Sequence, residues 1–366
     1  MKKIILFINS LNSGGAEHQL VQLADGLVEH GYDVTITTFG DSEDHYSFSP
    51  LVSRNRIAYE KPKLIKLLAI WKYFMMINAD WVIAFGQRES RFALEGLLLR
   101  SSKRTHVIAS ERNTTCGKPS FTEKLLVYYL YKRADYIVPN SHTQRNHIVD
   151  NHPKYKDKTI TITNYTDLTK YIPAPLPHKR CLRIGIFSRY HAQKNCMRFV
   201  DAVCLLRKKC NQPFVIEWYG NQHFNNNLPN PYYLEMKEKV TTFGLDDVLV
   251  LHNHVKDVSS LMSRFDAICL PSLREGFSNS IGEAICCGKP CLVSDIADNA
   301  LMVQNGINGF LFNPKDINAM VDAFIKFFTL SREERETMGH ASRRRAEELF
   351  DRERFLNGYI KLLESK

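Results

Sequence analysis

Short apolar runs alternate with stretches of helical periodicity along most of this chain of 366 residues. The first unit has an apolar run at 2–8, a glycine-containing turn at 9–15, a helical pattern at 16–30 and another apolar run at 34–39. Strand, turn, helix and strand in this order form the basic unit of a parallel sheet covered by helices. The pattern therefore predicts an α/β fold built from doubly wound parallel sheets.

The alternation continues in both halves of the chain. The first half is predicted to add strands at 81–85, 106–109, 136–138 and 159–162, and helices at 89–99 and 121–132. The second half is predicted to have a strand at 182–187, a helix at 195–209, a strand at 214–219 and further alternating segments at 232–243, 248–251, 258–263 and 267–270. From residue 316 onward the pattern is helical.

A proline-containing segment at 164–179 separates the two halves, and its composition is typical of an extended linker. The chain is long enough for two domains of ordinary size. We expect two Rossmann-like domains, at 1–170 and 171–366, that face a central cleft. The helical tail would pack back toward the N-terminal domain.

The formal net charge of +10 is concentrated in one region. Residues 54–133 contain sixteen Lys and Arg against six Asp and Glu, a local excess of ten. Such a region suits an anionic partner (nucleic acid, an acidic membrane face or a phosphorylated substrate), and a solvated basic surface is an equal alternative. No run of about eighteen apolar residues is present, so we expect no transmembrane helix. Nine cysteines without a CxxC pair favour free thiols in a reducing cytoplasm.

The most informative stretch for function is 270–292, in which Glu275 and Glu283 stand eight positions apart. Glu275 lies in a loop after a predicted strand, and Glu283 lies on the next helix, for which Ser278 and Asn279 are candidate N-caps. The N–H groups and the dipole of a helix N-terminus can hold a phosphate or a sugar oxygen. Two carboxylates beside such a site accept hydrogen bonds from hydroxyls, which suits a sugar nucleotide better than a bare phosphate.

Two other loops contribute candidate anion contacts. Arg189 and Lys194 follow the first predicted strand of the second half, and together they would neutralise a departing diphosphate. Taken alone, this pair is better explained as two solvated cations, but together with Glu275 and Glu283 it favours an anion site. Gly14 and Gly15 let the backbone approach a phosphate closely, although that turn lacks the GxGxxG fingerprint of dinucleotide sites. We expect no metal site, since the acidic residues at 41–44 are better explained as a polar loop.

These motifs together resemble the retaining glycosyltransferases of the GT-B fold, in the large group called family 4. The resemblance is carried by SGGAE at 13–17, by the loop at 188–195 and by the segment at 275–284, and it also includes Asn140-Ser141 and 164–167. It runs nearly end to end. Within the family the chain is similar to bacterial enzymes of surface polysaccharide and lipid-linked glycan biosynthesis.

The resemblance implies that the N-terminal domain at 1–170 binds the acceptor and that the C-terminal domain at 171–366 binds the donor. The donor would be a nucleoside-diphosphate sugar, with a UDP-sugar as the expected form. Glu275 would contact hydroxyls of the donor sugar, and Glu283 would contact the ribose hydroxyls. Arg189 and Lys194 would bind the diphosphate. The implied donor-binding residues are Gly14, Gly15, Arg189, Lys194, His254, Val255, Gly276, Phe277, Ser278, Asn279 and Glu283.

The implied chemistry is transfer with retained anomeric configuration, with no metal and no cofactor apart from the donor substrate. Many relatives have a histidine after the strand that ends at Ala109, where this chain has Glu111 and Arg112. A guanidinium binds phosphate or sugar oxygens but does not act as a base. The expected catalytic residues are therefore Glu275, Arg112 and, as a group that orients the acceptor, Glu111. The polar loop that begins at Gly220 also departs from the family pattern and leaves the base preference open.

The segment at 63–81 mixes apolar and basic residues at helical spacing. It is typical either of a surface helix that rests on an anionic membrane near a lipid-linked acceptor, or of an ordinary helix with solvated lysines. We expect a cytoplasmic enzyme, located at the inner face of the membrane if the first interpretation holds.

Two alternatives compete with a hexosyl- or N-acetylhexosaminyltransferase that acts on a glycan or lipid-linked glycan. A sugar-nucleotide epimerase has the same double Rossmann-like architecture, but it would need acid–base carboxylates and histidines in the cleft. A nucleic-acid-binding protein would explain the basic region, but the sequence lacks interleaved aromatic residues and any known motif of that class. The expected partners are therefore a nucleotide sugar and a glycan, and not nucleic acid.

Overall fold

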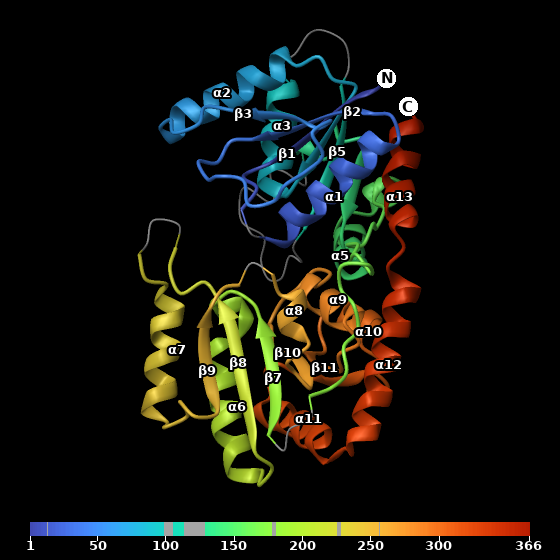
Figure 1. Cartoon of the computed structure of the whole chain (residues 1–366). Helices are drawn as coiled ribbons and strands as arrows, with labels where there is room; N and C mark the ends of the chain where they lie inside the picture. The colour runs from blue at the N-terminus through green and yellow to red at the C-terminus, as the bar shows by residue number, and fades with distance from the viewer. Residues whose placement is uncertain (13, 99–104, 113–128, 178–180, 225–227, 256) are drawn as a thin grey trace. The chain divides into compact units, whose positions relative to one another are not determined.

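The structure is a computed structural model that describes residues 1–12, 14–98, 105–112, 129–177, 181–224, 228–255 and 257–366 (Figure 1). Ser13, Asn113 and most of the predicted helix at 121–132 lie outside the described residues. The chain divides into two compact units, Met1–Asn164 with Arg352–Lys366, and Tyr165–Asp351. These bounds differ from the expected 1–170 and 171–366, because the first unit ends earlier and also includes the C-terminal helix.

The first unit contains, in its described residues, a parallel sheet of six strands in the order β3-β2-β1-β4-β5-β6. The strands are β1 (Lys3–Ile8), β2 (Asp33–Thr38), β3 (Ser53–Arg56), β4 (Trp81–Phe85), β5 (His106–Glu111) and β6 (Tyr136–Pro139). β1 pairs with β2 on one side and with β4 on the other. The chain thus extends the sheet first in one direction and then in the other, which creates a topological switch point between β1 and β4.

The helices of the first unit bury one apolar face against this sheet. They are α1 (Gly15–Glu29), α2 (Lys63–Met76), α3 (Gln87–Leu98), α5 (His142–Asn151) and α13 (Arg352–Glu364), with a 3-10 helix at Pro153–Lys158. In α1 the buried leucines Leu20, Leu23 and Leu27 recur at helical spacing, which explains why this segment is a helix. Ser141 caps α5, since its hydroxyl accepts a hydrogen bond from the Gln144 amide at 3.2 Å.

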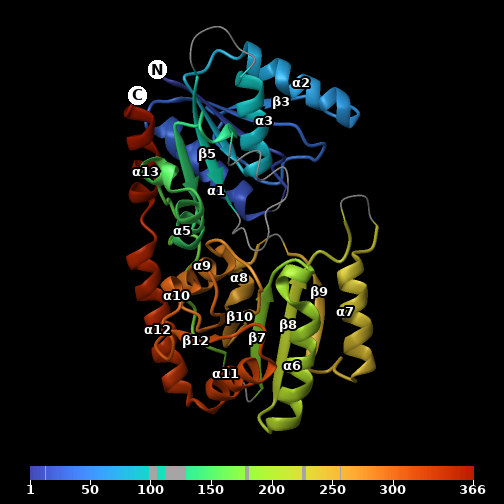
Figure 2. The same ribbon diagram turned by 180° about the vertical axis from the view of Figure 1, so that it is seen from behind.

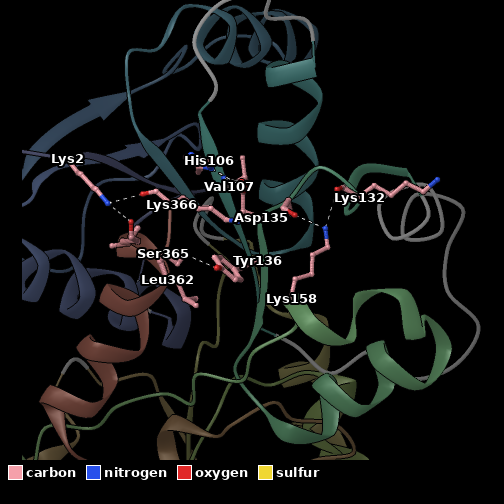
Figure 3. Close-up of polar contacts among 12 residues, drawn as sticks. Lys2, His106, Val107, Lys132, Asp135, Tyr136, Lys158, Leu362, Ser365 and Lys366 are labelled. Carbon is pink, nitrogen blue, oxygen red and sulfur yellow. Dashed lines mark hydrogen bonds and ion pairs between the residues drawn. The ribbon is translucent and has the colours of Figure 1, made fainter.

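The C-terminal helix α13 is an integral part of the first unit. A Cβ atom on Gly26 of α1 would lie 2.3 Å from a methyl group of Leu356, so only glycine allows the two helices to approach this closely. The two chain ends are also joined, because Lys2 Nζ donates a hydrogen bond to the carbonyl of Lys366 at 3.2 Å (Figure 3).

The second unit contains, again in its described residues, a parallel six-stranded sheet in the order β12-β11-β10-β7-β8-β9. The strands are β7 (Leu182–Phe187), β8 (Phe214–Gly220), β9 (Leu249–Asn253), β10 (Ala267–Leu270), β11 (Cys291–Ser294) and β12 (Gly309–Phe312). The chain builds β7 to β9 outward, returns to place β10 beside β7, and then builds outward on the other side. The switch point of this sheet therefore lies between β7 and β10.

The described helices of the second unit are α6 (Cys196–Lys209), α7 (Pro231–Thr242), α8 (Ser259–Met262), α9 (Asn279–Cys286), α10 (Asn299–Met302), α11 (Ile317–Thr329) and α12 (Arg332–Leu349), with a 3-10 turn at Ala192–Lys194. A hydrophobic core fills the space between the sheet and helices α6, α7 and α11. Figure 2 shows α6 lying over β7 and β8. There Phe199 of α6 packs edge-on against Trp218 of β8 at 5.5 Å and near Phe324 of α11 at 6.0 Å.

The predicted α/β class and the doubly wound parallel sheets are confirmed. The predicted strand at 159–162 is wrong, because Thr159 forms only an isolated bridge to Ile137. Three short strands were not predicted: β3, β11 and β12. β3 has the polar sequence SRNR and lies at the sheet edge, so it carries no apolar signal.

Candidate functional site

The switch point of the second sheet brings together two of the loops singled out by the sequence. One loop follows β7 and carries Arg189 and Lys194, and the other follows β10 and carries Glu275. β7 and β10 are hydrogen-bonded neighbours with parallel direction, so both loops leave the same edge of the sheet. In open α/β sheets this edge, at the switch point, is where ligands bind.

An ion pair joins the two loops. Lys194 Nζ lies 2.5 Å from Glu275 Oε1, and the two side chains are only 14% and 11% exposed. The backbone supports this contact, because the Leu273 amide donates to the Gln193 carbonyl at 2.8 Å. The Gln193 side chain in turn donates to the Arg274 carbonyl at 2.8 Å. Two of the predicted donor-site residues are thus held against each other by a network of short hydrogen bonds.

The turn that presents Lys194 depends on its neighbours. Asn195 follows it in the left-handed conformation with φ 65°, which asparagine tolerates better than most residues. The Asn195 side chain donates to the Pro314 carbonyl at 2.8 Å, which fixes the start of α6. His191 begins the turn, and its ring nitrogen accepts from the Gln193 amide at 3.2 Å.

Helix α9 begins directly after the Glu275 loop. Ser278 is its N-cap residue, as predicted, but the Ser278 side chain makes no capping hydrogen bond to the helix. The first turn of α9 carries the positive end of the helix dipole, which attracts anionic groups. Phe277 positions this turn, because its buried ring packs perpendicular to Phe350 at a centroid distance of 6.2 Å.

Glu283 lies in the second turn of α9. Burial raises the pKa of this carboxyl to about 7, although a hydrogen bond from Tyr171 and the charge of Lys170 act in the opposite direction. The next residue back, Gly282, allows close packing, since a Cβ atom there would lie 2.6 Å from Thr166 Oγ1. Sequence reasoning missed Tyr171, which belongs to the segment that was assigned to a linker. Thr166 lies in the 164–167 segment of the resemblance, but its packing against Gly282 was not predicted.

The other predicted residues of the second unit surround the same sheet edge. Arg189 is exposed and makes no ion pair with any described residue. His254 and Val255 follow β9 and are half-buried, and the His254 amide donates to the Asn253 side chain at 2.9 Å. The structure therefore places the predicted donor-binding residues of 189–283 at the carboxyl ends of β7, β9 and β10.

In the first unit, Gly14 and Gly15 lie at the start of α1, after β1. Gly14 is the N-cap residue with extended backbone, and a Cβ atom on it would lie 2.2 Å from the Glu17 carboxylate. Glycine thus lets Glu17 fold back over the first turn. The position fits the switch point between β1 and β4, but the predicted contact of these glycines with a donor stays a prediction.

Glu111 is the last residue of β5, Arg112 follows it directly, and both are buried. Glu111 accepts hydrogen bonds from Gln144 at 2.6 Å and Gln87 at 3.1 Å, and a further one from the Tyr131 hydroxyl. Three neutral donors therefore fix the orientation of this carboxyl group. A role for Glu111 in orienting an acceptor stays a prediction.

Arg112 is part of the packing of the first unit. Its guanidinium lies 4.1 Å from the ring centre of Phe85 and donates to Asn164 Oδ1 at 3.2 Å and to the Tyr359 hydroxyl at 2.5 Å. These contacts tie β5 to α13, a role that the sequence alone did not indicate. Its buried Nε has no hydrogen-bond partner among the described residues. The catalytic role predicted for Arg112 remains untested.

Comparisons with known proteins identify the family. A family model described as "Glycosyltransferase Family 4" matches residues 13–170, and one described as "Glycosyl transferases group 1" matches residues 181–329. The chain therefore belongs to the family 4 glycosyltransferases, and the resemblance inferred from its motifs is confirmed.

Two curated relatives and one solved structure illustrate the similarity. UDP-Gal:alpha-D-GlcNAc-diphosphoundecaprenol alpha-1,3-galactosyltransferase of Escherichia coli is 30% identical over 182 residues, which is 46% of this chain and less than half (45%) of that protein. N-acetylgalactosamine-N,N'-diacetylbacillosaminyl-diphospho-undecaprenol 4-alpha-N-acetylgalactosaminyltransferase of Campylobacter jejuni is 25% identical over 317 residues, 81% of each chain. HepE of Anabaena, solved in complex with UDP and glucose, has a TM-score of 0.83 at 18% identity and covers all of both chains, which supports the GT-B fold.

Proposed function

We propose that this chain is a metal-independent, retaining glycosyltransferase that uses a UDP-sugar as donor. The observation that carries the proposal is the Lys194–Glu275 pair beside the start of α9 at the β7–β10 switch point. The ammonium and the helix N-terminus suit a diphosphate, and the adjacent carboxylate suits sugar hydroxyls. The names of both curated relatives, which describe transfer of a hexosyl or N-acetylhexosaminyl group, support this donor class.

The proposed acceptor is a glycan, in particular one linked to a lipid diphosphate, in bacterial surface polysaccharide biosynthesis. Both relatives carry a diphosphoundecaprenol acceptor in their names. The enzyme would then act from the cytoplasm at the inner face of the membrane. Among the described residues, no helix is long and apolar enough to cross a membrane.

The chemistry follows from the proposed placement of the donor. Arg189 and Lys194 would stabilise the charge that develops on the diphosphate as the bond to the sugar breaks. Glu275 would hold the sugar by its hydroxyls, so that the acceptor attacks a fixed anomeric carbon. Exclusion of water would favour transfer over hydrolysis of the donor.

The test is incubation with a panel of UDP-sugars and a short-chain lipid diphosphate that carries one N-acetylglucosamine. We expect a disaccharide product with one UDP-sugar and an α-glycosidic bond, since the common UDP-hexose donors are themselves α-linked. A β-linked product would refute retention. Conversion of the donor sugar without acceptor would instead support the epimerase alternative. Absence of UDP binding in titrations would refute the donor site itself.

A further inference from the structure

Helix α2 exposes apolar side chains on the side that faces away from its own unit. Leu64, Ile65, Leu68 and Met76 are 70%, 50%, 55% and 73% exposed, and Met75 is 37% exposed. At 100° per residue these five positions fall on one face of the helix, about 20 Å long for its fourteen residues. Figures 1 and 2 show α2 at the periphery of the first unit, next to α3.

The opposite face of α2 is firmly packed. Ile70 and Phe74 are buried, and the ring of Phe74 meets Phe7 of β1 edge-on at 4.9 Å. Gly96 of α3 lets the helices approach closely, since a Cβ atom there would lie 2.6 Å from Phe74 Cβ. This packing prevents α2 from rotating to bury its exposed apolar residues. The helix is therefore apolar on both its buried and its exposed face.

The charge of α2 is entirely positive. Its sequence KLIKLLAIWKYFMM has three lysines and no acidic residue. Lys66 is paired with Asp41, whereas Lys63 and Lys72 are exposed and make no ion pair with any described residue. Lys72 lies within the exposed apolar face, and Lys61, which is also exposed, lies just before the helix. Apolar side chains flanked by lysines are the pattern of a helix that lies in the interface of a membrane.

We propose that the exposed face of α2, defined by Leu64, Ile65, Leu68, Lys72, Met75 and Met76, docks the first unit onto an anionic lipid surface. Charge complementarity favours this occupant over a second copy of the chain. Two α2 faces packed on each other would bring lysines together without any carboxylate on the helix to pair with them. An anionic headgroup layer neutralises the lysines, while its acyl boundary takes up the leucines and methionines.

The purpose of this surface rests on the proposed function, because a lipid-linked acceptor is reached only at a membrane. The binding itself does not depend on the donor site. Membrane affinity and UDP affinity are thus separate measurements, and failure of one leaves the other intact.

The experiment is flotation of the full chain with vesicles of phosphatidylcholine alone and of phosphatidylcholine with an equal part of phosphatidylglycerol. The apolar variant combines Leu64→Gln, Leu68→Gln and Met76→Gln, which keeps helix-forming residues at exposed positions. The charge variant combines Lys61→Gln and Lys72→Gln, because at 100° per residue Lys63 lies on the side of α2 opposite the exposed face. Its matched control changes two exposed lysines at the end of α6, with Lys208→Gln and Lys209→Gln. UDP titration checks that each variant is folded.

We expect the wild-type chain to bind the anionic vesicles, with weaker binding at high salt. The charge variant should bind roughly thirtyfold more weakly, since each lysine near an anionic surface contributes about fivefold. The apolar variant should lose at least about tenfold, and the Lys208 and Lys209 control should bind like wild type. Absence of wild-type binding, or equal binding by the apolar variant, would overturn the proposal. A dimer in solution that the apolar variant dissociates would also overturn it, in favour of a second copy as the occupant.

Discussion

The protonation state of Glu283 should control the affinity for a UDP-sugar near neutral pH. The pKa of this carboxyl is raised to about 7 by burial in α9. If two ribose hydroxyls donate hydrogen bonds to it, as proposed, the ionised form accepts both, whereas the protonated form has one oxygen that is an O–H donor and accepts more weakly. One pH unit below its pKa about a tenth of the carboxyl groups are ionised, so the affinity at pH 6 should be lower than at pH 8 by up to about tenfold.

The same shift predicts the pH dependence of stability without donor. A raised carboxyl pKa means that the folded state binds the proton more tightly than the unfolded state does. The stabilisation is therefore present below the unfolded value of 4.5 and is lost as the pH rises to about 7. The shift corresponds to about 3 kcal/mol, and partial solvent access should reduce the observed loss to about 2 kcal/mol.

The assay is calorimetric titration of a UDP-sugar between pH 6 and pH 8, on either side of the value of about 7 for Glu283. A UDP-sugar is preferable to UDP, since a terminal phosphate itself titrates with a pKa near about 6. Glu283→Gln should remove the pH dependence of binding, and urea unfolding of this variant should lose its dependence between pH 4.5 and 7. The control is Glu238→Gln, at an exposed position of α7. An equally steep pH dependence in Glu283→Gln would refute the reasoning.

Three further predictions concern single residues. Glu275→Gln should lower turnover by roughly a hundredfold or more while circular dichroism stays unchanged, because the sugar loses its charged acceptor; near-normal turnover would remove Glu275 from the site. Lys194→Gln should weaken UDP binding by about tenfold, with Lys194→Arg partly restoring it, and unchanged titrations would contradict a diphosphate contact. Gly309→Ala should destabilise the chain by about 3 kcal/mol in urea unfolding, because the new Cβ would lie 1.9 Å from the Cys291 carbonyl oxygen.

The elements that the sequence predicted best are buried strands and helices with a clear period. The bounds predicted for 81–85, 182–187 and 267–270 agree with β4, β7 and β10, because each of these runs is apolar apart from Arg183 and is followed by a loop. The strands that were not predicted are short or polar. β11 and β12 have only four residues each, and pairing with a neighbour, rather than local propensity, makes them strands.

In the candidate site, too, some residues could be predicted from the sequence and others could not. Its motif residues were identifiable because they lie in loops at strand ends and carry chemistry that packing does not require. Their partners were not identifiable, because contacts such as those of Tyr171 with Glu283 and of Arg112 with Tyr359 join segments far apart in sequence. Arg112 was predicted from its place in the motif, and the sequence did not indicate that its guanidinium makes specific hydrogen bonds within the first unit.

Without a donor, the Lys194–Glu275 ion pair leaves neither of these two side chains as an uncompensated charge. Both side chains are largely buried, and a carboxylate or ammonium in such a place is costly unless it is paired. A diphosphate would bring two negative charges to Lys194, which Arg189 and the α9 N-terminus could share. Glu275 would then be released to accept sugar hydroxyls. Donor binding would thus replace the Lys194–Glu275 ion pair by contacts of Lys194 with the diphosphate and of Glu275 with the sugar. A donor that has both a diphosphate and a hydroxyl-bearing sugar should therefore bind better than either part alone.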